Sequence, residues 1–194
     1  MSKVIYLSRH GQSKHNLEDK LGGNSDITKS GEDYAKKLFD YIQSQNIEKL
    51  NVYTSDLKRT KQTSKHFNRT RNFKFLNEIN AGIFENKTYD FVKKNHNNEY
   101  NLRKQDKFNY QYPKGESYKN LQDRTKKIFK YINEDYENET TSLVICHNAV
   151  VRLIYGKLLN ISNDRIPHID IPLHTLFKFE LIDNNYKLTV IDLS

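Results

Sequence analysis

The hydrophobic positions of the chain fall into short runs that alternate with longer stretches of helical period. Four apolar runs, each bounded by polar residues, are typical of strands buried on both faces of a sheet. These runs cover residues 4–7, 51–54, 73–76 and 143–146. Near the end of the chain, residues 177–181 and 187–191 flank the turn-forming triplet Asp183, Asn184 and Asn185. We therefore expect this last pair to form a β-hairpin.

Four stretches between the apolar runs have the period of an amphipathic helix. The first, residues 30–43, has apolar side chains at positions 35, 38, 39 and 42, with Thr28 or Ser30 as a candidate N-cap. The other three cover residues 58–67, 117–136 and 149–158. Strands that alternate with helices predict an α/β fold of three layers, in which a mixed, mostly parallel sheet carries helices on both faces.

Length and composition narrow the class of protein. We expect a single domain over residues 1–194, because no repeat, linker or break in composition divides the chain. Hydrophobic residues make up 36% and charged residues 29%, which favours a folded chain over a disordered one. A short apolar start, one cysteine and no apolar run near about 18 residues predict a soluble, cytoplasmic protein without a membrane partner.

The formal net charge of +8 is compatible with two kinds of ligand. Basic domains attract nucleic-acid backbones, and an enzyme for a small, multiply phosphorylated substrate also benefits from positive charge. The lysines and arginines are scattered, with no block of five or six like charges. Net charge alone therefore does not choose between these ligands.

Residues 89–117 differ from the rest of the chain. This stretch is polar, aromatic and basic, and it has little regular period beyond a possible helix near its start. Long ordered loops in compact domains are usually functional, and the many tyrosine and phenylalanine residues favour order here. We expect a substrate-binding loop.

Chemically capable side chains follow each of the four predicted strands at the point where the strand ends. Ligands of open α/β sheets bind beyond these carboxyl ends, so the side chains are expected to share one site. Gly11 is expected to let the chain turn so that its two predecessors reach the same phosphate. In chain order the strand ends carry Arg9 and His10, then Ser55 and Arg59, then Glu78, then His147 and Asn148.

These residue types suit phosphoryl transfer. The guanidinium groups of Arg9 and Arg59 can make paired contacts with phosphate oxygens. A neutral imidazole at His10, kept unprotonated by the nearby cations, can attack phosphorus and form a covalent intermediate. Glu78 can protonate the departing oxygen, and His147 can hold the transferring oxygens as charge develops on them. The sequence thus predicts a phosphatase site.

The motif RHGQS, directly after the first strand, resembles the signature of the histidine phosphatase superfamily, which includes the cofactor-dependent phosphoglycerate mutases. Further segments resemble, in the same order, the fructose-2,6-bisphosphatase half of the bifunctional kinase/bisphosphatase family. They cover nearly the whole chain. These segments are GGNSDITKSG, YTSDLKRTKQT, LNEINAGIFENKTYD, LRKQDKFNYQYPKGESY, VICHNAVVR and PLHT.

The resemblance implies a role for each matching position. It implies a phosphoglycerate mutase-like fold and a metal-independent enzyme without a cofactor. Its implied substrate is a sugar bisphosphate, fructose-2,6-bisphosphate, cleaved at the 2-phosphate through a phosphohistidine on His10. Glu78 would be the proton donor and His147 the second histidine of the phosphate pocket. The transferred phosphate would contact Arg9, Asn16 and Arg59, and the rest of the substrate would contact Gly22, Gly23, Tyr89, Arg103, Lys107, Tyr118, Asn148 and Arg152.

The chain also departs from the pattern of the family that it resembles. Asn148 stands where a glutamine is usual, one methylene longer, and Asn80 stands where an aspartate is usual. Phe108 and Asn109 replace more polar or basic residues in the 89–117 stretch. These changes bear on affinity and selectivity. The kinase signature GxxxxGK[ST] does not occur in the sequence, so we expect a protein that only consumes the sugar bisphosphate.

Several of the singled-out residues have simpler explanations. Cys146 next to His147 could indicate a Cys-His pair, but neighbours on a strand face opposite sides, so a buried structural thiol is expected. Lys107 and Arg103 could form a solvated face, and Tyr89 and Tyr118 could be packing residues. The remaining histidines show no metal-ligand spacing and are expected to be structural or surface residues: His15, His66, His96, His168 and His174.

Two other functions stay open at this point. One is the same chemistry on another small phosphate ester, by a mutase or a broader phosphatase, although the basic residues of the 89–117 stretch favour the bisphosphate. The other is a non-catalytic module that binds a phosphorylated ligand or nucleic acid. The complete acid-base set argues against that module, and we expect no nucleic-acid partner.

Overall fold

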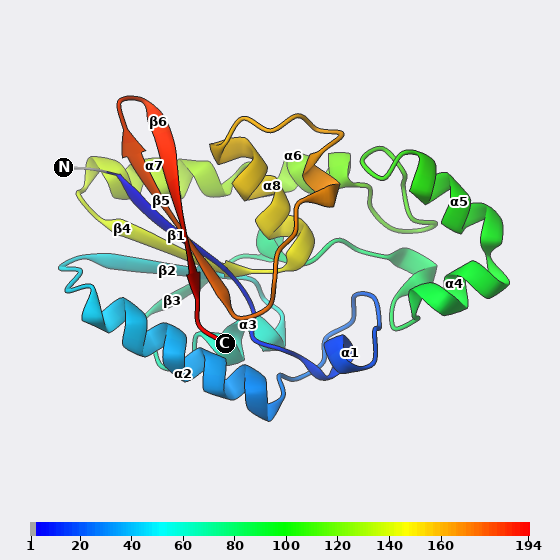
Figure 1. The fold of residues 1–194 in the computed structure, drawn as a ribbon, viewed down its shortest axis with the longest axis horizontal. Helices are drawn as coiled ribbons and strands as arrows, with labels where there is room; N and C mark the ends of the chain where they lie inside the picture. Colours follow the sequence, from blue (N-terminus) through cyan, green and yellow to red (C-terminus); the bar gives the residue numbers. More distant parts are fainter. Residues whose placement is uncertain (1–2) are drawn as a thin grey trace.

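The computed structural model describes residues 3–194, and a six-stranded sheet runs through the centre of this part of the chain (Figure 1). The strand order is β3-β2-β4-β1-β5-β6. The first four strands are parallel to one another, whereas β5 is antiparallel to β1 and to β6. The prediction of a mostly parallel, mixed sheet is confirmed. The strands are β1 (Val4–Arg9), β2 (Leu50–Thr54), β3 (Thr70–Asn72), β4 (Thr141–Cys146), β5 (Thr175–Ile182) and β6 (Asn185–Asp192).

Helices cover both faces of the sheet, which gives the three predicted layers (Figure 1). On one face, α2 (Lys29–Ser44) packs with the side chains of Tyr6, Val52 and Leu143. On the other face lie α6 (Tyr118–Thr125), α7 (Ile128–Glu137) and α8 (Asn148–Leu158). Their apolar residues pack against the alternate strand positions, because successive side chains of a strand point to opposite faces.

Shorter helices complete the described structure. α1 (Lys14–Leu17) and α3 (Lys58–Thr63) follow β1 and β2, and α4 (Tyr89–Asn95) and α5 (Asn97–Gln105) form a hairpin that projects from the layers (Figure 1). Three short 3₁₀ helices are η1 (Lys74–Leu76), η2 (Gly82–Phe84) and η3 (Ile166–His168). Within residues 3–194, no helix combines the length and the apolar character needed to cross a membrane.

The strand predicted at residues 73–76 is wrong. The third strand lies earlier, where Thr70 pairs with Val52, and residues 74–76 form η1 instead. The apolar residues of this run pack in an aromatic cluster outside the hydrogen-bonded strands of the sheet. The rings of Phe73 and Phe75 stack at 4.7 Å, and Phe73 lies 4.6 Å from the ring of Tyr131 on α7. An apolar run cannot by itself separate a buried strand from an aromatic cluster.

Two other predictions of local structure need correction. The helix predicted over residues 117–136 is divided into α6 and α7. At the junction, the backbone carbonyls of Lys126 and Lys127 accept hydrogen bonds from the N–H groups three residues ahead, which is the tighter 3₁₀ pattern. The 89–117 stretch is mostly helical, with α4 and α5 in place of a loop. Its expected order is confirmed by the buried side chains of Phe108 and Tyr112.

Candidate active site

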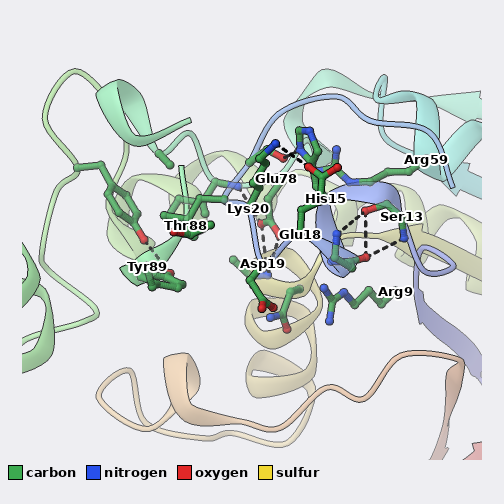
Figure 2. Close-up of a pocket in the computed structure, with 18 of the residues that line it drawn as sticks. Arg9, Ser13, His15, Glu18, Asp19, Lys20, Arg59, Glu78, Thr88 and Tyr89 are labelled. Atoms are coloured by element: carbon green, nitrogen blue, oxygen red, sulfur yellow. Dashed lines mark hydrogen bonds and ion pairs between the residues drawn. The ribbon is translucent and has the colours of Figure 1, made fainter. Parts of the chain in front are cut away.

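A cavity of about 590 Å³ lies beyond the carboxyl ends of β1 and β4. In Figure 2, Arg9 and Arg59 lie toward one end of this cavity and Tyr89 lies at the other. His147, Gly23 and Lys107 are not among its lining residues. The predicted site residues that line it are Arg9, His10, Asn16, Gly22, Arg59, Glu78, Tyr89, Arg103, Tyr118, Asn148 and Arg152. The structure therefore gathers most of the predicted site residues around one cavity.

His10 and His147 lie side by side and are bridged by one arginine. Their ring centroids are 5.2 Å apart, and both side chains are buried. The Nε–H of Arg59 points between them, at 3.1 Å from His10 Nε2 and 3.1 Å from His147 Nδ1. A guanidinium only donates hydrogen bonds, so both of these ring nitrogens act as acceptors.

The hydrogen bonds also determine the tautomer of His10. Its Nδ1 lies 2.8 Å from the carbonyl oxygen of Gly11, which can only accept, so Nδ1 carries the proton. The Nε2 lone pair is then free of hydrogen and is directed toward Arg59. Burial, followed by the charges of Arg59 and Arg9, holds the pKa of His10 well below its usual value. His10 is therefore a neutral imidazole near pH 7 with an unprotonated Nε2.

His147 is held from its other side by a hydroxyl. Because its Nδ1 accepts from Arg59, Nε2 carries the proton and donates to Ser55 Oγ at 2.7 Å. Ser55 Oγ in turn lies 2.8 Å from Thr60 Oγ1. Burial, then the charge of Arg59, holds the pKa of His147 well below its usual value. His147 is thus fully buried, and it is not among the residues that line the cavity.

Arg9 contributes a second guanidinium at the same end of the cavity. It is largely buried, and its Nε has no hydrogen-bond partner within the described structure. Burial lowers its pKa to about 10, and Glu78 opposes that shift while Arg152 and Arg59 add to it. A buried donor without a partner carries a substantial desolvation cost. An anion in the cavity would satisfy it and would offset the repulsion among these cations.

Glu78 reaches the same place from the segment that follows η1. Its Oε1 accepts from the backbone N–H of Ile79 at 2.9 Å. Both carboxylate oxygens lie near the backbone nitrogen of Ala149, in the first turn of α8, at 3.3 and 3.4 Å. A guanidinium nitrogen of Arg124 fixes the backbone by donating to the Glu78 carbonyl at 3.0 Å. The carboxyl group is therefore positioned beside the arginines, within one wall of the cavity.

Asn16 lies at the N-terminal turn of α1 and forms a capping box with Ser13. Its Oδ1 accepts from the backbone N–H of Ser13 at 2.9 Å and from the Ser13 hydroxyl at 3.0 Å. Since the oxygen is used by the cap, the amide nitrogen is the end left to donate to a ligand.

Arg9 and His10 both line the cavity, as the prediction for Gly11 required, although Gly11 does not have a positive φ. Its small size is needed for packing instead. A Cβ at this position would lie 2.5 Å from the carbonyl oxygen of Gly31 on α2. The close contact lets the loop after β1 lie directly on the start of α2.

Gly22 and Gly23, in contrast, both require glycine for their backbone conformation. Their φ angles are +58° and +65°, which other residues rarely adopt. The carbonyl oxygen of Gly23 accepts from Arg59 Nη1 at 2.7 Å, so this turn orients the arginine between the histidines. Gly22 lines the main cavity, and Gly23 lines a neighbouring one of about 440 Å³.

A second cation group, made up of Arg103, Lys107 and Arg152, lies apart from the histidines. Arg103 Nε donates to Tyr112 Oη at 2.8 Å, and its guanidinium lies 4.7 Å from the ring centre of Tyr89. Arg152 donates to the carbonyl oxygen of Ile169 at 2.7 Å and to Tyr118 Oη at 3.2 Å. Tyrosines and backbone carbonyls therefore hold this group in place.

Lys107 is adjacent to the cavity without lining it. Its Nζ donates to the carbonyl oxygen of Pro167 at 2.7 Å. Burial, with the charges of Arg103 and Arg152 adding to it, lowers its pKa to about 8. The charges of Arg103 and Arg152 thus oppose that of Lys107, as expected of a site built for an anion.

The departures noted in the sequence lie in different surroundings. Asn148 lines the cavity, and its Oδ1 has no partner within the described residues. Phe108 is buried and stacks on Tyr118 at 6.4 Å, and Asn109 donates to Asp106. Asn80 is held through its backbone by Glu116. Of the four, only Asn148 lines the cavity.

Sequence reasoning missed several residues around the cavity, and one of them is His15, which was expected to be a structural or surface residue but lines the cavity. Tyr112 is buried and links Tyr89 to Arg103 through its hydroxyl group, with the Tyr89 hydroxyl at 3.2 Å. Its tyrosine-rich surroundings were the available signal. Glu18 and Asp19 also line the cavity, and in Figure 2 they lie between Arg9 and Tyr89; as isolated charges they carried no signal in the sequence. Among residues 3–194, no three His, Cys, Asp or Glu side chains are grouped to hold a metal ion.

Cys146 does not pair with His147. It is fully buried on the face of β4 that packs against α8, and burial raises the pKa of its thiol. The expectation of a structural thiol agrees with this position.

Comparison with known proteins identifies relatives of this chain. The chain is 40% identical over 177 residues to the 6-phosphofructo-2-kinase/fructose-2,6-bisphosphatase of Gallus gallus, and 41% identical to isoform 1 of Homo sapiens. Each match covers 91% of this chain and 37% of the relative, so the chain spans little more than a third of their length.

Solved structures show the same fold. The alpha-ribazole phosphatase of Shigella flexneri superimposes with a TM-score of 0.84 at 18% identity, covering 97% of this chain and 96% of that one. Bacillus stearothermophilus YhfR gives a TM-score of 0.83 at 22% identity, covering 98% of both chains. A family model, that of the histidine phosphatase superfamily (branch 1), matches residues 5–193. The chain belongs to the histidine phosphatase superfamily.

Proposed function

We propose that this protein is a phosphatase that hydrolyses the 2-phosphate of fructose-2,6-bisphosphate and releases fructose 6-phosphate and phosphate. One observation carries the proposal. The Nε2 of His10 is unprotonated and lies beside two arginines at one end of a cavity whose other end holds the second cation group. A substrate with two phosphates matches a cavity that has Arg9 and Arg59 beside His10 and a second group of cations further along its wall. The 40% identity to bisphosphatase-containing relatives supports the same substrate.

In the first step, the lone pair of His10 Nε2 attacks the phosphorus of the 2-phosphate. The N–P bond forms as the bond from phosphorus to the sugar oxygen breaks, and Glu78 gives its proton to that oxygen. Arg9 and Arg59 hold the charge that spreads over the equatorial oxygens. Fructose 6-phosphate leaves, and a phosphohistidine remains.

In the second step, water attacks the phosphohistidine. Glu78, now a carboxylate, takes a proton from the water as the new O–P bond forms and the N–P bond breaks. Phosphate leaves, Glu78 regains its proton and His10 regains its lone pair. His147 supports both steps by holding Arg59 in place, because its Nδ1 accepts from Arg59 Nε at 3.1 Å.

The second cation group binds the 6-phosphate and orients the sugar. Arg103 and Arg152 line the cavity, and Lys107 is drawn from Pro167 toward the bound phosphate. Tyr89 and Tyr118 complete this end through their hydroxyl groups, and Asn148 faces the sugar between the two ends. Gly23 acts indirectly, through the carbonyl oxygen that orients Arg59.

The test uses purified protein and fructose-2,6-bisphosphate labelled in the 2-phosphate. We expect released phosphate and a transient acid-labile label on the protein, both abolished in His10→Ala. His66→Ala is the matched control, because His66 packs against Phe39 outside the cavity and should retain both signals. Rates with other sugar phosphates and with phosphoglycerates would reveal a different substrate. Absence of labelling with every ester would overturn the phosphatase assignment.

A further inference from the structure

His174 has unusual geometry for a residue without a role in the proposed chemistry. It precedes β5 (Thr175–Ile182) and has a φ of +61°, in the left-handed region that a histidine seldom adopts. Its ring stacks on the ring of Tyr34 from α2 at 4.8 Å with an angle of 16° between them. Its Nε2 lies 3.2 Å from the backbone nitrogen of Gln12, two residues beyond His10. Strained backbone of this kind is often retained because it places a side chain.

The contact with Gln12 determines the state of the ring. A backbone N–H can only donate a hydrogen bond, so His174 Nε2 must accept and must be unprotonated. The imidazole is then neutral, with its proton on Nδ1. An imidazolium would present a donor to a donor, and the bond to Gln12 would be lost.

Both backbone polar groups of Gln12, its N–H and its carbonyl oxygen, have hydrogen-bond partners. Its carbonyl oxygen accepts from the backbone N–H of Thr28 at 2.8 Å, at the start of α2. It also lies so near Gly31 that a Cβ there would be 2.3 Å away. The backbone N–H of Gln12 donates to His174 Nε2. The loop that carries His10 is therefore held in part by a hydrogen bond to a titratable ring.

The groups around His174 decide when it titrates. Lys37 from α2 and Arg9 from β1 oppose protonation, and Asp192 from β6 favours it. Tyr34 faces the ring as a neutral phenol, with its hydroxyl 2.6 Å from Ser8 Oγ. Burial is the largest influence and, together with the two cations, it lowers the pKa of His174 below the usual value. His174 also acts on the nucleophile, because a charge on His174 disfavours the charged form of His10 and lowers its pKa.

We propose that His174 is a positioning residue: as a neutral imidazole it holds the Gln12 peptide and thereby aims His10 Nε2, and protonation releases that hold. The part of this proposal that concerns turnover rests on the proposed function. The part that concerns the hydrogen bond and the aim of His10 does not.

The first experiment compares His174→Gln with His174→Phe. The glutamine Oε1 can still accept from Gln12, whereas phenylalanine keeps an aromatic ring on Tyr34 and has no acceptor. We expect the rate of His10 phosphorylation at about pH 7.5 to fall roughly 10- to 100-fold in the phenylalanine variant and by less than about threefold in the glutamine variant, with KM little changed. Equal rates in the two variants at equal melting temperature would overturn the proposal.

The pH profile separates positioning from simple packing. On acidification His174 should gain a proton before His10, whose pKa is lowered further. The wild type should therefore lose activity at a higher pH than His174→Gln, which has no ring to titrate. Identical acid limbs in the two proteins would contradict the proposal, and this comparison holds even if the phenylalanine variant does not fold.

A third measurement needs no substrate. In ¹⁵N-labelled protein, the ring nitrogens of His174 should report an unprotonated Nε2 at neutral pH, and orthovanadate, a phosphate mimic, should bind more weakly to His174→Phe than to His174→Gln. If these results hold while fructose-2,6-bisphosphate is not hydrolysed, the proposed substrate fails and the role of His174 stands. A protonated Nε2, or equal vanadate affinity, would overturn that role whatever the substrate.

Discussion

The two ends of the cavity are built in different ways. At the histidine end, Arg9 and His10 lie at the end of β1, and Arg59 lies on α3, which follows β2. His10 and Arg59 are fixed by short hydrogen bonds, whereas the Nε of Arg9 is buried without a partner in the described structure. At the other end, Arg103 and Lys107 come from the projecting α4–α5 region and are held by tyrosine hydroxyls, ring faces and a backbone carbonyl. The histidine end is preorganised by the sheet, whereas two of the three members of the second cation group, Arg103 and Lys107, come from a peripheral segment and only Arg152 comes from the core helix α8. The first arrangement suits chemistry, and the second suits recognition.

The largest effect should come from breaking the histidine end at its central bridge. Arg59→Ala removes the group that orients both histidines and that also faces the phosphate, so kcat should fall by about 10³-fold. Because Arg59 lowers the pKa of His10, its loss should raise that pKa, which an NMR titration of the ring would show. Arg59→Lys keeps the positive charge but lacks the planar guanidinium that can donate several hydrogen bonds at once. It should therefore recover only a small part of the lost kcat. A fall in kcat of less than about tenfold in Arg59→Ala would argue against this bridge.

A smaller effect, of a different kind, should follow from Arg103→Ala at the other end. KM for the bisphosphate should rise by about 10- to 50-fold while kcat changes little, because this contact is the same in the bound substrate and in the transition state. Lys104→Ala is the matched control, since Lys104 is the exposed neighbour on α5 and should leave KM unchanged. A fall in kcat without a rise in KM would erase the distinction between the two ends.

The smallest effect concerns pH. The pKa of Lys107 is about 8, so the ammonium is charged below that pH and loses its proton above it. KM should therefore rise by about three- to tenfold between about pH 7 and pH 9, as one cation of the group is lost. Lys107→Arg stays charged throughout this range and should have a flat KM profile. A flat profile in the wild type would show that Lys107 does not take part in binding.

The same contrast explains which features could be predicted from the sequence. The histidine end was accessible because strand ends in a parallel sheet converge on one edge, so Arg9, His10 and Asn148 could be placed together from the pattern alone. The depth of His147 could not be foreseen. Its burial involves hydrogen bonds with Arg59 and Ser55, which follow β2, whereas His147 follows β4.

The peripheral end was harder to predict because its contacts are tertiary. The period of residues 89–117 did not reveal two helices, since α4 and α5 carry few buried apolar side chains. Tyr112 could not be ranked above the neighbouring tyrosines before its contact with Arg103 was known. The misplaced third strand has a similar origin. Phe73 and Phe75 form an apolar run because their rings pack against Tyr131 on α7, far along the chain, and this contact cannot be seen in the sequence.

Cys146, the one cysteine in the sequence, has a consequence for oxidative stress. Peroxide attacks the thiolate form of cysteine, and enzymes that use a thiolate nucleophile are inactivated when it becomes a sulfenic acid. Here the thiol is fully buried and its pKa is raised, so it stays protonated and out of reach. The nitrogen nucleophile proposed beside it has no comparable oxidation chemistry. The catalytic centre should therefore keep working at peroxide concentrations that inactivate phosphatases with a reactive thiolate.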